Sequence, residues 1–259
     1  MLYFAQAPAT DSARRMTDDQ LLSYIFEDGR AHALSAEFAT WLAASARFKL
    51  FAETYRDKIR KKIRGTRDDD GLRDLQFELQ VAYLLLQERR LAVEYEKGGV
   101  GKQRGPDFYV TFKTRLPFNV EVTHIRLSAQ DRRSEQQEFG KIASTACQKI
   151  GQLPAGMINL LVVVYDNGIH GGYNVVDALT RLRALAEQKD EQFFLRRGFT
   201  GSRDFLRQYQ RLSAVLFRGN LPDQPGAAQS LLWLNPIARQ RLPAELKNIL
   251  QRLGNHAGG

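Results

Sequence analysis

The chain has 259 residues, with 38 Lys or Arg against 29 Asp or Glu, so its formal net charge is +9. Hydrophobic residues make up 43% of the sequence, which is enough for a core and excludes wholesale disorder. The single cysteine, Cys147, excludes an internal disulfide and a cysteine-based zinc site. The longest apolar run, 157–165, is too short to span a bilayer, and residues 1–10 lack the pattern of a secretory signal. We therefore expect a soluble, cytoplasmic, basic protein without a membrane partner, and the charge favours a polyanion.

Helical patterns dominate the first third of the chain. Residues 16–64 carry apolar side chains at steps of three and four, and Thr17 with Gln20 has the spacing of a capping box. Another helix is expected over 68–89, because three aspartates at its start suit a helix N-terminus. The sequence thus predicts a helical extension over residues 1–66.

The hydrophobic period changes after residue 90 to that of strands. Strands are predicted at 91–96, 107–113, 118–125, 158–165, 213–217 and 231–234, and helices at 134–151, 175–190 and 238–253. The second and third strands form a hairpin around residues 114–117, and the continuous apolar run at 158–165 indicates a strand buried on both faces. Residues 67–259 are therefore predicted to be an α/β domain with a mixed sheet, with α+β as the alternative.

Two carboxylates lie on the polar face of this hairpin. The alternation of apolar and polar side chains assigns Asp107 and Glu121 to the same face. A turn centred on Arg115 places Asp107 opposite Thr123 and diagonal to Glu121, with about 7 Å between the two acidic residues at the backbone. Such a pair can bind one hard cation, Mg²⁺ or Mn²⁺. The alternative is that Asp107 caps a turn after Pro106 and Glu121 is an ordinary exposed strand residue.

A short motif surrounds this pair. Glu78 on a helix, Pro106 and Asp107 opening one strand, and Glu121 in the next strand together resemble the PD-(D/E)xK nuclease superfamily. The predicted αβββαβ order over residues 68–165 is similar to the restriction-endonuclease-like core of that family.

The resemblance implies a metal-dependent hydrolysis of DNA phosphodiester bonds. It assigns the metal to Asp107, Glu121 and the backbone carbonyl of Val122, with Glu78 reaching the metal directly or through water. It also implies a lysine two residues after Glu121, where this chain has Thr123.

Threonine at this position is a departure that matters, because its hydroxyl can hydrogen-bond a water but carries no charge. The helix predicted over 134–151 offers a replacement. Lys149 lies at the boundary between its apolar and polar flanks and can send its ammonium toward the polar face of the sheet. Lys141 on the same helix is the second candidate. The alternative is that both are solvated lysines of an ordinary amphipathic helix.

Two basic clusters suit sequence-independent contacts with phosphates. The candidate nucleic-acid-binding residues are Lys58, Arg60, Lys61, Lys62, Arg64, Arg196, Arg197 and Arg203. Solvated helix faces are the alternative for each cluster. We therefore expect a nuclease acting on DNA. A catalytically inactive protein of the same fold that binds nucleic acid or a protein partner is the second hypothesis, a small-molecule hydrolase is the third, and a homodimer stays open.

Overall fold

The computed structural model describes residues 16–27, 32–96, 105–128, 130–165, 169–219 and 230–255. The chain divides into two compact units, Met1–Arg67 and Asp68–Gly259. None of the helices in these ranges is long and apolar enough to cross a membrane. The loop predicted around residues 98–101 lies outside the described residues.

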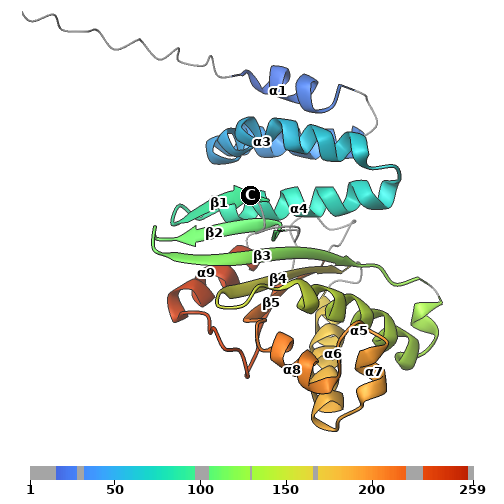
Figure 1. Cartoon of the computed structure of the whole chain (residues 1–259). Helices are drawn as coiled ribbons and strands as arrows, with labels where there is room; N and C mark the ends of the chain where they lie inside the picture. Colours follow the sequence, from blue (N-terminus) through green and yellow to red (C-terminus); the bar gives the residue numbers. More distant parts are fainter. Residues whose placement is uncertain are drawn as a thin grey trace, which may run out of the picture. The chain divides into compact units, whose positions relative to one another are not determined.

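The described residues of the first unit, 16–27 and 32–67, form helices, as the apolar periodicity over 16–64 predicts. Its helices are α1 (Asp18–Ile25), α2 (His32–Ala44) and α3 (Ala46–Gly65), labelled in part in Figure 1. Thr17 and Gln20 form the predicted capping box at the start of α1. Ser45 separates α2 from α3 and caps α3 by accepting a hydrogen bond from the Phe48 N–H. Aromatic rings fill the core of the unit, and the centroids of Phe38 and Phe48 lie 5.2 Å apart.

The second unit is an α/β structure, which confirms the predicted fold class. Its helices are α4 (Asp69–Gln87), α5 (Glu135–Gln152), α6 (Ile169–Glu187), α7 (Glu191–Leu195), α8 (Ser202–Tyr209) and α9 (Ala244–Asn255), with a short 3₁₀ helix, η1 (Asp131–Arg133). Its strands are β1 (Leu91–Tyr95), β2 (Phe108–Phe112), β3 (Leu116–Ile125), β4 (Ile158–Tyr165), β5 (Ala214–Gly219) and β6 (Ser230–Leu234).

One sheet joins all six of these strands in the order β1-β2-β3-β4-β5-β6. The first three strands are antiparallel neighbours, whereas β4 and β5 continue parallel to β3, and β6 returns antiparallel to β5 (Figure 1). The chain therefore runs in the order α4-β1-β2-β3-α5-β4 through the region that carries the acidic motif.

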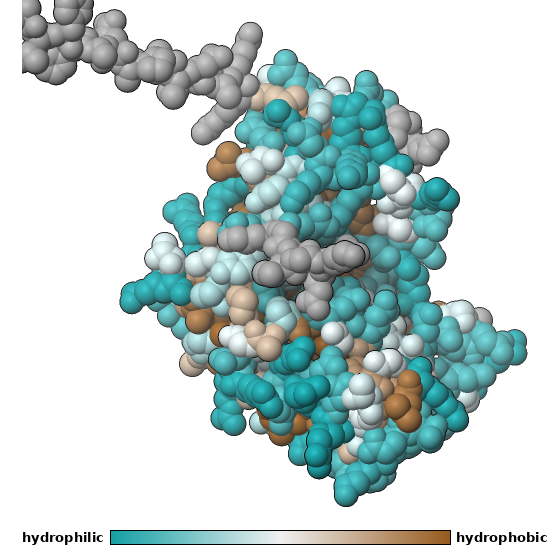
Figure 2. All heavy atoms as spheres, in the orientation of Figure 1, coloured by the Kyte–Doolittle hydropathy of each residue, from teal (hydrophilic) through white to brown (hydrophobic). Residues whose placement is uncertain are grey.

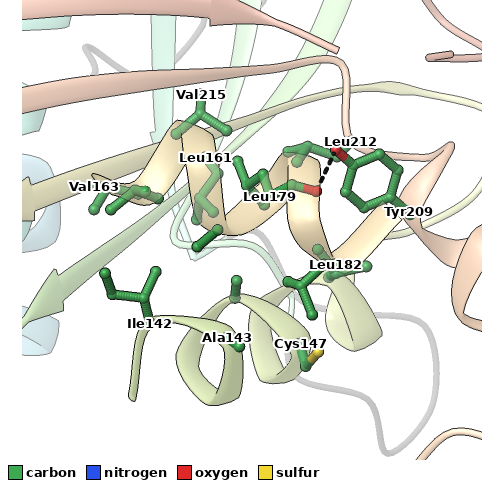
Figure 3. Close-up of a cluster of buried hydrophobic side chains, with 14 of the residues drawn as sticks. Ile142, Ala143, Cys147, Leu161, Val163, Leu179, Leu182, Tyr209, Leu212 and Val215 are labelled. Atoms are coloured by element: carbon green, nitrogen blue, oxygen red, sulfur yellow. Dashed lines mark hydrogen bonds between the residues drawn. The ribbon is translucent and has the colours of Figure 1, made fainter. Parts of the chain in front are cut away.

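Helices cover both faces of the sheet. Leu161 and Val163 of β4 pack into a core with α5, α6 and α8 (Figure 3). The alternate residues Leu160 and Val162 point to the other face, where they line one small pocket together with residues of α4 and α9. Every residue of β4 is buried, which confirms the strand that was predicted to be covered on both sides.

The hairpin has a different register from the predicted one. Phe108 pairs with Val120, so the pairing is displaced by two residues, and the turn occupies residues 113–115. Lys113 and Thr114 adopt positive φ angles of 48° and 63°. Neither residue type signals this left-handed conformation, so the sequence could not locate the turn. A displacement by two leaves every side chain on its predicted face.

Helix limits also differ from the sequence expectation. α6 begins at Ile169, six positions before the predicted start at 175. α9 begins at Ala244 and not at 238, because Pro243 disfavours helical backbone in the residue before it. The short helices α7 and α8 were not predicted, because five and eight residues carry too little periodicity to be recognised.

Candidate active site

Two carboxylates meet at the start of β2, where β3 runs on beyond its antiparallel partner. Continuing the observed register places Asp107 directly opposite Glu121, which corrects the predicted diagonal arrangement. The Val122 N–H donates to Asp107 Oδ2 at 2.8 Å, and the Asp107 N–H lies 3.4 Å from Glu121 Oε2. Asp107 is only 5% exposed. Asp107 is therefore buried and Glu121 half-buried. The Val122 N–H orients the Asp107 carboxylate, and the Asp107 N–H orients that of Glu121.

A lysine from α5 completes this group. Lys149 Nζ lies 2.6 Å from Glu121 Oε1, and the side chains of Lys149 and Glu121 are 20% and 12% exposed. Ile150, the next residue, is fully buried in the core under α5, so Lys149 sits at the edge of the packed helix face. The Lys149 ammonium of α5 thus lies on the same face of β3 as the Glu121 side chain.

The electrostatics of Glu121 reflect both neighbours. Burial raises the pKa of Glu121, and the negative charge of Asp107 raises it further. The charge and hydrogen bond of Lys149 act in the opposite direction. A cation at this position therefore favours the ionised form of a carboxylate that its surroundings otherwise disfavour.

Thr123, which occupies the motif lysine position, and Lys141, the second candidate to replace that lysine, differ in their distance from the acid pair. Thr123 is half-buried in β3 and lies two residues beyond Glu121 on the same face. Lys141 is exposed and lies eight residues before Lys149, which is about 12 Å along the helix axis. Hydrogen bonds from Ser128 lower the pKa of Asp131, and the charge of Lys141 adds to that effect. The structure thus brings Lys149, and not Lys141, to the acid pair.

The third candidate acid, Glu78, lies on α4. Glu78 is 9% exposed and lies among the buried residues of α4. Burial raises the pKa of Tyr95 far above its usual range, and the negative charges of Glu78, Glu96 and Asp107 raise it further. Glu78 and Asp107 therefore act on the same buried hydroxyl.

The donor set is compatible with a hard divalent cation. Asp107 and Glu121 supply two carboxylates on adjacent strands, and Val122, whose carbonyl was assigned to the metal, lies beside them. Within the described ranges, no cluster of three or more His, Cys, Asp or Glu side chains is arranged to hold a metal ion. Mg²⁺ commonly binds through one or two carboxylates and keeps several waters, so the residues present fit that type of site.

The basic cluster on α3 is partly engaged within its own unit. Arg60 and Arg64 both pair with Glu27, and Lys58 lies 5.7 Å from the centre of the Tyr55 ring. A pocket of about 380 Å³ is lined by Tyr24, Asp57, Arg60, Lys61 and Arg64. Lys61 is exposed, whereas Lys62 is half-buried. The cluster therefore presents part of its positive charge to solvent and uses the rest in internal pairs.

The second basic cluster, around α7 and α8, divides in the same way. Arg197 donates to the Phe193 carbonyl at 3.0 Å and lies 3.5 Å from the centre of the Phe193 ring, and burial lowers its pKa. Arg196 and Arg203 are exposed. Hydrophilic residues cover most of the molecular surface visible in Figure 2. Arg196 and Arg203 thus face solvent, whereas Arg197 contacts Phe193 within the fold.

Fold and site together define an α/β protein with two opposed carboxylates, one buried and one half-buried, and an adjacent lysine. In comparisons with models of protein families, with curated proteins and with solved structures, no significant match to this chain is found.

Proposed function

We propose that this protein is a metal-dependent nuclease of the PD-(D/E)xK kind that hydrolyses phosphodiester bonds of DNA. The observation that carries the proposal is the opposed pair of buried Asp107 and half-buried Glu121, with the Lys149 ammonium 2.6 Å from Glu121. The order α4-β1-β2-β3-α5-β4 supports it, because the family resemblance implies the same αβββαβ order.

In this proposal Asp107, Glu121 and the Val122 carbonyl hold Mg²⁺ or Mn²⁺, and Glu78 contributes directly or through water. When bound, the metal lowers the pKa of its water and neutralises charge on the scissile phosphate. The carboxylates suit this role because their backbone hydrogen bonds fix their orientation before the cation arrives.

Lys149 takes the role that the family assigns to the lysine of its motif. Its ammonium lies on the Glu121 face of β3, where it can orient the attacking water and stabilise negative charge that develops on the phosphate. Thr123 lies farther along the same face and can hydrogen-bond a water there. Both groups act from rigid elements, a helix and a central strand.

DNA is proposed as the substrate because the chain carries a net positive charge and exposes basic residues in both of its compact units. The exposed basic residues on α3, and separately those around α7 and α8, can contact phosphates without reading sequence. Such binding weakens as salt concentration rises, because it depends on release of counterions from DNA.

Cleavage of plasmid DNA with Mg²⁺ or Mn²⁺ tests the proposal. The variants Asp107→Asn and Glu121→Gln remove one ligand charge each, and we expect each to lower the cleavage rate by at least about 100-fold, the upper range for groups that only support a metal ligand. Lys149→Met should also lower it strongly. Lys141→Met is the matched control, because it removes an exposed lysine from the same helix and should leave the rate unchanged. Cutting that persists in both acid variants would remove the site assignment.

A catalytically inactive protein of this fold that binds nucleic acid or a protein partner is the second candidate. Thr123 at the motif lysine position favours it. This alternative would be favoured over the nuclease by two results together. The protein would cleave DNA with neither Mg²⁺ nor Mn²⁺, and its affinity for DNA would fall steeply as the salt concentration rises.

A further inference from the structure

Arg218 is a buried arginine that the proposed function does not use. It is the last residue but one of β5, and it is only 5% exposed. Its Nη1 atom is buried and has no hydrogen-bond partner in the part of the chain that the structure describes. Burying a guanidinium is costly unless the group is paired with a negative charge and hydrogen-bonded. Arg218 therefore needs a partner that its described neighbours do not supply.

Other arginines that are withdrawn from solvent show the usual solution in this chain. Arg126 pairs with Asp74. Arg197 donates to the Phe193 carbonyl at 3.0 Å. For Arg218, by contrast, burial lowers the pKa to about 10, and no charge within the described ranges offsets that effect. A pKa of about 10 leaves the guanidinium charged at neutral pH, so Arg218 is a buried cation without a counter-charge from the described residues.

The surroundings of Arg218 are apolar. Arg218 and Leu216 point to the face of the sheet that α4 and α9 cover, and with residues of both helices they line a pocket, here called the α4–α9 pocket. The other lining residues are all Val or Leu, among them Leu85 of α4, Val162 of β4 and Leu250 of α9. Among the residues described, Arg218 is therefore the one polar side chain that lines this pocket.

Size and polarity determine what can occupy the α4–α9 pocket. Its volume is about 10 Å³, which is room for about one particle of the size of a water. A buried water needs about two to four polar partners, and this lining offers one polar residue. A phosphate or sulfate, with four oxygens around a central atom, is too large. A monatomic anion fits, because a single positive charge can hold it without several hydrogen bonds.

We propose that the α4–α9 pocket is a binding site for a monatomic anion such as chloride, with the Arg218 guanidinium as its charged ligand. The bound anion neutralises Arg218 between the sheet and its covering helices and so stabilises the folded protein. The site is separate from the carboxylate pair. Glu121 pairs in register with Leu161, which packs toward α5 on the opposite face of the sheet. The proposal is therefore independent of the nuclease function.

Thermal unfolding of the full chain in chloride, with ionic strength kept constant by gluconate, tests this site. Gluconate is too large for the pocket. Because the anion binds the folded protein, the Tm should rise by about 3–5 °C for each tenfold increase of chloride above its dissociation constant. Arg218→Met should remove this dependence. Arg73→Met is the matched control, because it removes an exposed arginine of α4, and it should keep the dependence.

Two results of this experiment would overturn the proposal. One is a Tm of the natural protein that does not change when gluconate replaces chloride. The other is a chloride dependence that persists in Arg218→Met. Acetate provides a test of size, since a carboxylate has more atoms than the pocket has room for. Stabilisation by acetate as strong as that by chloride would contradict a monatomic ligand.

A direct measurement uses the natural protein and needs no variant. Crystals soaked in bromide, a monatomic anion with strong anomalous scattering, should show an anomalous peak beside the Arg218 guanidinium. Bromide peaks confined to exposed arginines would indicate an adventitious ion only and would overturn the assignment.

Discussion

At the scale of single residues, the main feature of the site is one lysine that offsets the negative charge of two opposed acids, Asp107 and Glu121. Asp107 and Glu121 face each other across neighbouring strands, an arrangement that would be unfavourable if both were ionised without a cation. Because the pKa of Glu121 is raised, the folded protein binds the Glu121 proton more tightly than the unfolded chain does. Its contribution to stability therefore falls as pH rises above the usual glutamate range, and Lys149 limits that loss.

This balance predicts opposite shifts in two variants. Lys149→Met removes the group that lowers the pKa of Glu121, so the carboxyl should titrate at higher pH than in the natural protein. Asp107→Asn removes a charge that raises this pKa, so the carboxyl should titrate at lower pH. Carbon-13 NMR of the metal-free protein measures both midpoints, with Lys141→Met as an unshifted control. Shifts of the same sign in the Lys149 and Asp107 variants would contradict this account.

At the scale of elements, a buried amide network aligns the strands that carry the site. The Asn119 side-chain amide donates to Asn159 Oδ1 at 3.0 Å, which joins β3 to β4. The Asn159 amide in turn donates to the carbonyls of Pro154, Met157 and Arg211. Asn159 is 0% exposed, so these bonds lie in the core. The network connects the turn after α5 to strands β3 and β4. It therefore helps to fix the position of α5, and with it Lys149, along β3.

Asn159→Ala should therefore destabilise the protein strongly. The substitution leaves several buried carbonyls and one amide without their partner, and we expect the free energy of unfolding to fall by about 3 kcal/mol. Urea denaturation followed by circular dichroism measures the change. Gln148→Ala on the exposed side of α5 is the comparison and should stay within about 0.5 kcal/mol of the natural protein. A loss of similar size in both variants would contradict the network's role.

At the scale of the whole molecule, the candidate site and the α3 cluster belong to different compact units. The acids and Lys149 lie in Asp68–Gly259, whereas the basic cluster on α3 lies in Met1–Arg67. The larger unit has its own sheet and covering helices, and so it has the elements of an independent domain.

This division predicts that a fragment of residues 68–259 retains cleavage and binds DNA more weakly. Without the cationic cluster of α3, the slope of log affinity against log salt concentration should become shallower, by about one for each phosphate that α3 neutralises in the full chain. Filter binding over a salt series, with the full chain in parallel, measures the slope. An unchanged slope would show that α3 does not bind phosphates.

Much of this architecture follows from local pattern. The periods of apolar residues predicted the helices over 16–64 and the buried strand at 158–165, and alternation predicted the polar face shared by Asp107 and Glu121. These features are readable because a strand repeats every two residues and a helix every 3.6, whatever the rest of the chain does. The hairpin turn was misplaced because Lys113 and Thr114 carry no signal for positive φ.

Composition and period by themselves determined that this is a basic α/β protein with two acids on one face of a hairpin. Only the tertiary structure decided that those acids are directly opposed and that Lys149, and not Lys141, meets Glu121. The physical reason is that such encounters join residues far apart in the chain. They depend on strand register and on how helices pack against the sheet, and no local repeat encodes either.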